Sequence, residues 1–182
     1  MEASGGAGAR RARDRRLFLI VAVVLAAGAS SRYGTQPPKQ SVFLPAVLDA
    51  LARSVVDGVV VVAGAHPVEA EAPVVECRDW ERGAGASLRC GLAELGPDVE
   101  AAVVALADGP DLDPRAVDRV VADWREHGGT AVAASYGSVR LHPVLLARET
   151  WGRVPDEGAR TIPARLVPCD DLRPPGDVDV RR

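Results

Sequence analysis

Aromatic residues are scarce in this sequence of 182 residues, at 4 %, whereas hydrophobic residues of all kinds make up 47 %. A core with so few large rings has to be built from valine, alanine and leucine. The chain is long enough for one domain with a substantial core. We expect residues 1–16, rich in glycine, alanine and arginine, to form a disordered basic tail, and residues 17–182 to form that single domain.

Cysteine is scarce as well. The three cysteines, Cys77, Cys90 and Cys169, are an odd number, and no two of them have the Cys-x-x-Cys spacing of zinc and redox sites. Disulfide frameworks belong mainly to secreted proteins. The pattern therefore predicts reduced thiols in a cytoplasmic protein, with neither a disulfide framework nor a zinc site.

Positive charge is not in excess. The formal net charge is −3, which argues against a nucleic-acid-binding protein. The basic cluster Arg10–Arg16 and the apolar run after it resemble a secretory signal peptide, so an exported protein is one alternative. Cleavage near Ala27 would remove the first strand of the domain, and the run is too short to span a bilayer. We therefore favour a cytoplasmic protein that binds neither nucleic acid nor membrane.

Apolar runs and helical spacings alternate along the chain. The β-branched run 18–25 predicts a buried strand, and apolar residues at helical spacing predict a helix over 41–55. Strand, helix and strand in that order imply a parallel sheet with a right-handed crossover. Asp113 and Gly128 are expected to begin and end a later helix. Further strands are expected at 59–63, 74–75, 101–107 and 130–135, with helices at 67–72, from Ser87 onwards and at 114–127.

The first strand leads into a loop of small residues, and we call residues 26–34 the phosphate loop. Small side chains let an anion approach backbone N–H groups at the carboxyl end of a sheet, while Arg32 and Lys39 supply opposite charge. No Gly-Lys-Ser/Thr follows, so this is not a Walker A loop, and Gly-x-Gly-x-x-Gly is missing too. The loop predicts a triphosphate site; a strand-to-helix turn with solvated charges is the alternative.

The string Leu25-Ala-Ala-Gly-x-Ser-x-Arg-x-Gly, with Pro38-Lys39 after it, resembles the signature of the MobA-like nucleotidyltransferases. These enzymes transfer a nucleoside monophosphate from an NTP to a phosphorylated acceptor. The resemblance implies an α/β fold of the Rossmann-like, three-layer α/β/α kind, with a mostly parallel sheet and helices on both faces. It implies a nucleotide site made of Leu25, Ala26, Ala27, Gly28, Ser30, Ser31, Arg32, Lys39 and Ser87.

Ser87 belongs to a second segment of small residues. The family has Gly-x-Ser-x-Ser-Leu…Gly-Leu near the nucleotide base and the acceptor, and this sequence has Gly85 in place of the middle serine. It keeps the other positions of that segment, which are Gly83, Ser87, Leu88, Gly91 and Leu92. The alternative role for Ser87 is that of a helix N-cap.

Asp108 ends a buried strand, where open α/β sheets bind their ligands. The local string resembles the family's Leu-Ala-Asp-x-Pro, which implies that Asp108 holds Mg²⁺; a turn residue is the alternative. Asp177 and Asp179 resemble the family's Asp-Ile-Asp-Thr, so one of them is a candidate second metal ligand, although a terminal acidic pair can also be simply solvated. Together with Arg32 and Lys39, Asp108 makes up the predicted catalytic set.

Two further segments imply an acceptor side. His142-Pro-Val-Leu resembles the family's Gly-His-Pro-Val-Leu, with Leu141 in place of the glycine. The segment 155–160 resembles Gly-Asp-x-Gly-Ala-Arg, with Pro155 in place of the first glycine. The resemblance places His142 and Arg160 on the acceptor side, and for His142 a structural role is equally open. No general base is required, because the attacking phosphate is already ionised.

The nucleotide is predicted from the loop. Leu-Ala-Ala-Gly is more typical of cytidylyl transfer than of guanylyl transfer, and Lys39 lies five residues after Gly34, as in methylerythritol phosphate cytidylyltransferase. The resemblance favours transfer of CMP from Mg²⁺·CTP to a molybdopterin-type acceptor, with a molybdoenzyme as a possible downstream partner. The alternatives are a non-catalytic NTP-binding protein and a cytidylyltransferase acting on a sugar or polyol phosphate.

Overall fold

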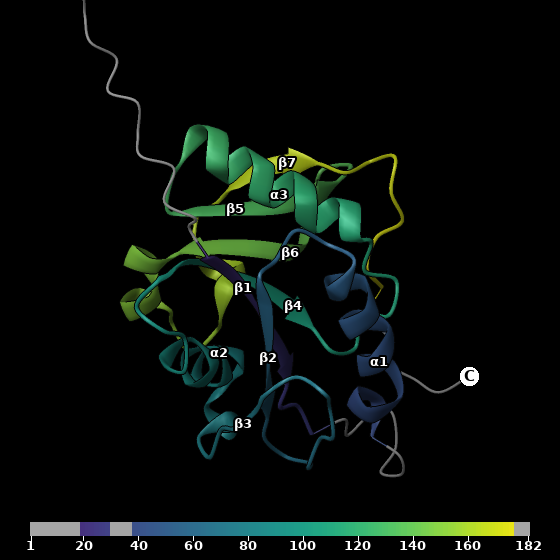
Figure 1. Ribbon diagram of the computed structural model, residues 1–182, viewed down its shortest axis with the longest axis vertical. Helices are drawn as coiled ribbons and strands as arrows, with labels where there is room; N and C mark the ends of the chain where they lie inside the picture. The colour runs from purple at the N-terminus through teal and green to yellow at the C-terminus, as the bar shows by residue number, and fades with distance from the viewer. Residues whose placement is uncertain (1–18, 30–37, 177–182) are drawn as a thin grey trace, which may run out of the picture.

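The computed structural model describes residues 19–29 and 38–176. A seven-stranded sheet, with the strand order β3-β2-β1-β4-β6-β5-β7, lies between helices on both of its faces (Figure 1). This is the predicted α/β architecture of three layers with a mostly parallel sheet.

β1, Leu19–Ala26, lies at the centre of the sheet, between β2, Gly58–Ala63, and β4, Val99–Leu106. Both pairings are parallel, and β3, Val74–Glu76, adds a parallel strand beyond β2. Most side chains on both faces of β1 and β4 are buried, which explains their runs of valine and alanine. The four strands predicted for this part of the chain are confirmed.

One strand runs against the others. β6, Val139–Ala147, pairs antiparallel with β4 on one side and with β5, Ala131–Tyr136, on the other. A tight turn at Gly137, whose φ is +62°, joins β5 to β6, and β7, Arg165–Pro168, pairs parallel with β5 at the edge. The amino end of β6 therefore lies at the same edge of the sheet as the carboxyl ends of β1 and β4.

The helices form the two outer layers. α1 and α3 contact one another and cover one face of the sheet, whereas α2 and three short 3₁₀ helices belong to the other face, with α2 against β1 and β2. The bounds are α1 Lys39–Ala52, α2 Ala84–Ala93, α3 Pro114–His127, η1 Trp80–Arg82, η2 Arg148–Arg153 and η3 Ala159–Thr161.

The ends of α3 follow the prediction from sequence. The Asp113 carboxylate accepts a hydrogen bond from the backbone N–H of Arg115, at 2.9 Å, as an N-cap does. Proline fits the first helical position because it has no N–H to lose. The helix ends where Gly128 takes a φ of +64°, which favours glycine.

Two predictions of local structure were wrong. No helix forms over 67–72, since six residues are too few to hold a helix without tertiary support. That segment instead leads into the sheet, where the carbonyl of Pro73 accepts a hydrogen bond from Val61 N–H at 2.9 Å. α2 begins at Ala84 rather than at Ser87, so Ser87 lies inside the helix, only 3 % exposed, and is not its N-cap.

The prediction of three reduced thiols was wrong for two of them. Cys77, which follows β3, forms a disulfide with Cys90 on α2, and their Cα atoms lie 5.8 Å apart. The two cysteines are thirteen positions apart and form no recognisable motif, because it is the packing of α2 against the sheet that brings them together. Cys169 is a free, buried thiol, as predicted.

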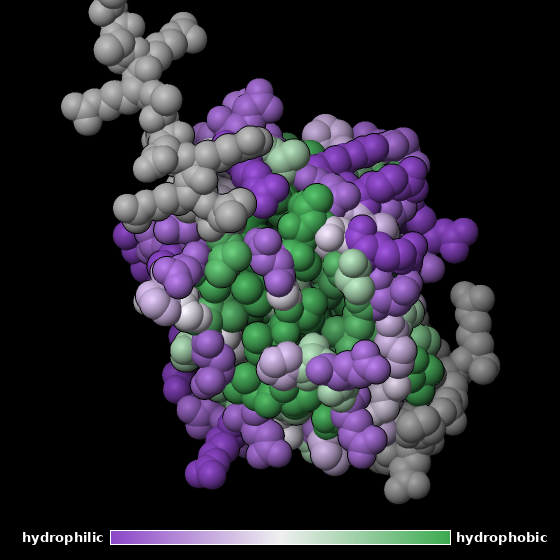
Figure 2. Space-filling model, viewed as in Figure 1, coloured by the Kyte–Doolittle hydropathy of each residue, from purple (hydrophilic) through white to green (hydrophobic). Residues whose placement is uncertain are grey.

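The surface over the β2–β3 edge is apolar. Figure 2 shows hydrophobic residues gathered over the middle of the face on which β2 lies, with hydrophilic residues around them. Val55, just before β2, and Val74, in β3, are among the exposed large hydrophobic side chains. Within residues 19–29 and 38–176, no helix has the length and apolar character needed to cross a membrane.

Candidate active site

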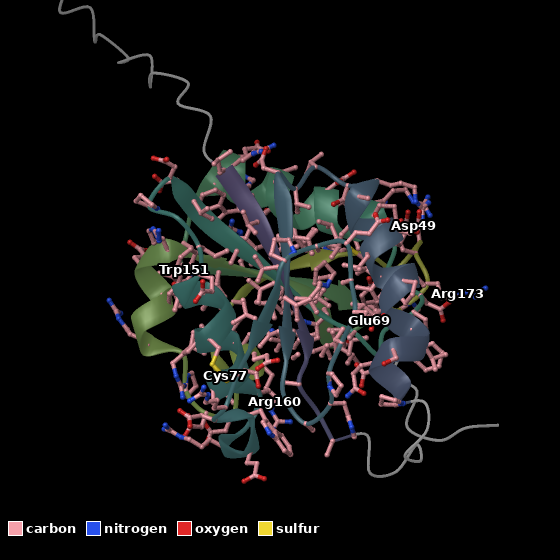
Figure 3. The ribbon with its side chains drawn as sticks, turned by 60° about the horizontal axis from the view of Figure 1, so that its bottom comes forward. Asp49, Glu69, Cys77, Trp151, Arg160 and Arg173 are labelled. Carbon is pink, nitrogen blue, oxygen red and sulfur yellow. A yellow bond between two sulfur atoms is a disulfide. The ribbon has the colours of Figure 1, made fainter. Side chains whose placement is uncertain are left out.

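One edge of the sheet gathers most of the described residues that the sequence singled out. The carboxyl ends of β1 and β4 and the amino end of β6 meet there and border a cleft of about 440 Å³. Figure 3, which brings this edge forward, shows Arg160 and Cys77 together on the side opposite α1 and Arg173. The cleft is lined by Leu25, Arg82, Gly83, Ala84, Val104, Leu106, His142, Asp156, Glu157, Gly158, Ala159 and Arg160.

The start of the phosphate loop is braced on both sides. The carbonyl of Leu25 accepts a hydrogen bond from Ala107 N–H, and the carbonyl of Ala27 accepts one from Ala65 N–H, each at 3.1 Å. Residues 26–29 therefore leave the sheet in a fixed direction, held from β2 and β4. Ser30, Ser31 and Arg32 lie outside the described residues. Lys39 is the first residue of α1, but its side chain is outside them too, so these roles stay predictions.

Gln40 is a residue that the sequence analysis missed. Its side chain is only 4 % exposed, and its Nε2 donates a hydrogen bond to the carbonyl of Gly28 at 2.7 Å. A polar side chain on the first turn of α1 thus holds the glycine of the phosphate loop. A polar residue beside the predicted Lys39 was the available signal, but the contact itself depends on how α1 packs against β1.

We expect Gln40→Glu to weaken binding of Mg²⁺·CTP by roughly tenfold, in line with the 1–3 kcal/mol that an unsatisfied buried polar group costs. A carboxylate cannot donate to the Gly28 carbonyl, so the two oxygens would repel each other. Calorimetry measures the affinity. Ser41→Ala, at an exposed neighbouring position, is the control and should bind like the unaltered chain. Equal affinities for Gln40→Glu and the unaltered chain would show that Gln40 does not hold the loop.

Asp108 follows the carboxyl end of β4, as expected for a ligand-binding acid. Its charge acts on His142 and favours the protonated imidazole, so the two side chains lie in the same corner of the edge. Asp177 and Asp179 lie outside the described residues. Among the residues that are described, no three histidine, cysteine or acidic side chains are grouped closely enough to hold a metal ion.

His142 is held as a neutral imidazole. Burial lowers its pKa below the usual range, and the nearby Arg140 acts in the same direction, whereas the hydrogen bond to the Val104 carbonyl and the Asp108 charge oppose this. The Nδ1 atom lies 3.2 Å from the carbonyl oxygen of Val104. A carbonyl only accepts, so Nδ1 carries the proton and Nε2 remains a hydrogen-bond acceptor. His142 lines the cleft, and its place on the acceptor side stays a prediction.

The segment 155–160 forms one wall of the cleft. Arg160, an acceptor-side candidate, lines the cleft and is exposed. Asp156 is held between two guanidinium groups, those of Arg82 and Arg89, and the hydrogen bond from Arg89 is the main reason that its pKa lies below the usual range. These ion pairs could not be predicted from the sequence.

The start of α2 forms the facing wall. Gly83 and Ala84 line the cleft, while Ser87, one turn further along the helix, is buried and does not. A nucleotide contact by Ser87 therefore remains a prediction.

The model of the MobA-like NTP transferase domain family matches residues 22–166 of this sequence. The chain belongs to this family of nucleotidyltransferases. The match runs from β1 into β7, so it includes the phosphate loop, Asp108, His142 and both walls of the cleft. No protein of curated function matches the sequence.

Solved structures resemble this MobA-like domain over most of its length. Rv0371c from Mycobacterium tuberculosis H37Rv is 27 % identical with a TM-score of 0.74, covering 90 % of this chain and 93 % of that one. Rv0371c in complex with manganese is 24 % identical, with a TM-score of 0.67 and 86 % and 91 % covered. CMP:2-keto-3-deoxy-manno-octonic acid synthetase complexed with CTP shares the fold, with 12 % identity, a TM-score of 0.66, and 89 % and 93 % covered.

Proposed function

We propose that this MobA-like domain transfers CMP from Mg²⁺·CTP to a phosphorylated small molecule and releases pyrophosphate. The observation that carries the proposal is the meeting of three features at one edge of the sheet: the braced start of the phosphate loop, Asp108, and the cleft with its two walls. A molybdopterin-type acceptor is favoured by the resemblance of the loop motif. A molybdoenzyme would then be the downstream partner.

The reaction is an in-line substitution at phosphorus. An oxygen of the acceptor phosphate forms a bond to the α-phosphorus of CTP, and the bond from that phosphorus to the bridging oxygen breaks as pyrophosphate leaves. Such a reaction needs positioning and charge neutralisation more than a covalent nucleophile. The neutral His142 fits this requirement, because its free Nε2 can accept a hydrogen bond from a substrate without adding charge.

The residues present fit a magnesium ion that binds together with the nucleotide. Mg²⁺ in nucleotide sites is held by one or two carboxylates plus substrate phosphates, and Asp108 supplies one such carboxylate at the strand end. Asp177 or Asp179 is the proposed second one. When bound, the ion offsets the charge that develops on the phosphate oxygens. The manganese complex of Rv0371c is in keeping with a divalent ion here.

The preference for CTP rests on the motif at the end of β1, Leu25-Ala-Ala-Gly. A protein with the same fold has been solved in complex with CTP, which is in keeping with a cytidine nucleotide here. We predict that CTP binds more tightly than GTP by about 1–3 kcal/mol, since discrimination depends on a few polar contacts in a pocket. Calorimetry with both nucleotides and Mg²⁺ measures the difference. A preference for GTP would overturn the cytidylyl assignment.

The activity is tested by screening for pyrophosphate release. Four NTPs are each paired with molybdopterin and with a panel of sugar and polyol phosphates. We expect release only with CTP and one class of acceptor, and the responding acceptor decides between molybdopterin and a sugar or polyol phosphate.

One observation favours a second candidate, an NTP-binding protein without transferase activity. Leu141, in place of the family's glycine, lines a smaller apolar pocket beside the cleft, where it narrows the approach of an acceptor. Tight binding of Mg²⁺·CTP without pyrophosphate release for any acceptor would identify this function.

A further inference from the structure

The two walls of the cleft are in direct contact with each other. One wall is loop 154–160, which follows the start of α2 by about seventy residues in the sequence and packs against the first turn of that helix. The backbone N–H of Gly85 donates a hydrogen bond to the carbonyl of Asp156 at 2.9 Å. Because Arg82–Ala84 on one side and Asp156–Arg160 on the other both line the cleft, this contact fixes the spacing between its walls.

Glycine is required where the loop meets the helix. A Cβ atom on Gly85 would lie 1.7 Å from the carbonyl oxygen of Pro155, and one on Gly83 would lie 2.5 Å from the carbonyl oxygen of Asp156. Both contacts are with backbone atoms, which cannot swing aside as a flexible side chain could. No residue larger than glycine fits at position 85 unless the loop moves outwards.

The close contact joins two departures from the family pattern. In the motifs that this sequence resembles, serine takes the place of Gly85 and glycine that of Pro155. The two positions are seventy residues apart in the sequence, yet they touch beside the cleft, which their neighbours Ala84 and Asp156 line. The absence of a side chain at 85 allows the loop to approach, and the proline ring restricts the backbone at the point of contact.

Ion pairs hold the loop in this position. The Asp156 carboxylate bonds to Arg89, on α2, at 2.5 Å and to Arg82, in η1, at 3.3 Å. Arg89 also donates a hydrogen bond to the carbonyl of Val154 at 2.7 Å, so one side chain grips the loop at two points. These groups are a third to more than half exposed, so their effect is to position the loop rather than to stabilise the fold strongly.

We infer that the nucleoside of the NTP lies in the cleft between these two walls, and that the Gly85–Pro155 contact, held by Asp156, sets the width of this nucleoside-binding part, whereas His142 and Arg160 mark the part that the acceptor reaches. Asp156 is a positioning residue, because its carboxylate is engaged by the two arginines. The inference rests on the proposed function, since it concerns how the same site recognises its nucleotide. The triphosphate is held elsewhere, by the phosphate loop, so the two halves of the ligand can be tested separately.

The experiment compares two probes, Mg²⁺·CTP and Mg²⁺·tripolyphosphate, by calorimetry. The variants are Gly85→Ser, Pro155→Gly, the double variant, and Asp156→Asn, which removes the charge but keeps the shape. Gly152→Ser is the matched control, because no atom lies within 4 Å of a Cβ placed there. The thermal midpoint without ligand, measured for each variant, identifies any that fail to fold.

Gly85→Ser should weaken binding of CTP by about tenfold or more and leave tripolyphosphate binding within about twofold, since only the nucleoside wall moves. The double variant should recover most of the lost affinity, because glycine at 155 lets the carbonyl rotate away from the serine, and coupled neighbours are not additive. Asp156→Asn should likewise weaken binding of CTP and leave binding of tripolyphosphate nearly unchanged. Gly152→Ser should bind both probes like the unaltered chain.

Three results would overturn the inference. Gly85→Ser could bind CTP with normal affinity, it could lose affinity for CTP and tripolyphosphate equally, or the effects of Gly85→Ser and Pro155→Gly on CTP affinity could be simply additive. These outcomes leave the proposed function standing as long as the unaltered chain binds CTP. An unaltered chain that does not bind CTP, whether or not it binds tripolyphosphate, would refute the proposed function itself, which separates the two failures.

Discussion

Replacing Asp108 by asparagine should leave the fold intact and lower metal-dependent pyrophosphate release by about a hundredfold or more, because charge stabilisation by a bound metal ion is worth several kcal/mol. Asparagine keeps the shape of the side chain and removes its charge, so the change isolates the electrostatic contribution. Asp108 stands at the end of β4, beside the brace that Ala107 N–H makes with Leu25. Initial rates across a Mg²⁺ titration measure the effect.

Asp111→Asn is the matched control for this prediction. Asp111 lies in the same turn, but its carboxylate is 46 % exposed and contacts Arg173 at 3.6 Å. An exposed ion pair of that kind contributes little to stability, so Asp111→Asn should release pyrophosphate at the same rate as the unaltered chain. Undiminished release by Asp108→Asn, or an equal loss in both variants, would contradict a metal-binding role for Asp108.

Reducing the Cys77–Cys90 disulfide should lower the free energy of unfolding by about 3 kcal/mol, the value that the chain-entropy model gives for a closed loop of this size. For a domain of this length, that loss corresponds to a fall of roughly 6–12 °C in the thermal midpoint. Chemical denaturation with and without a reductant measures the change. The disulfide anchors α2, which carries Arg89, so CTP binding should weaken on reduction as well.

Two variants serve as controls for the disulfide. The double variant Cys77→Ala, Cys90→Ala should be less stable than the unaltered chain and should no longer respond to the reductant. Cys169→Ala removes the buried free thiol and should leave the response to the reductant unchanged. If the unaltered chain unfolds at the same denaturant concentration with and without the reductant, the disulfide does not contribute to its stability.

The central strands could be predicted because the residues within each strand show by themselves that both of its faces are buried. Runs such as 18–25 and 101–107 are apolar on both faces because helices cover both sides of the sheet. A continuous apolar run therefore indicates a strand in the middle layer of the fold. The cap at Asp113 was predictable for a similar reason, since the residues that make the contact are two positions apart. The place of Asp108 follows from the end of its strand.

Contacts between distant segments could not be predicted in this way. Gln40 reaches Gly28 only because α1 packs against β1, and Asp156 meets Arg89 only because loop 154–160 returns to α2. The disulfide has the same origin, since Cys77 and Cys90 are brought together by the packing of α2. The helix predicted over 67–72 failed for the opposite reason: its local pattern was too short to outweigh the approach of that segment to β2.

The central place of β1 bears on how the protein is made. β1 leaves the ribosome well before its partner β4, which is synthesised only after β2, β3 and α2. Pairings distant in sequence form late, because the chain between them must first be ordered. One edge of this apolar strand therefore stays open through the middle of synthesis, a stage at which a nascent chain is prone to aggregate. The start of the phosphate loop gains its brace from Ala107 only when β4 arrives, so the edge of the sheet that borders the cleft is completed late.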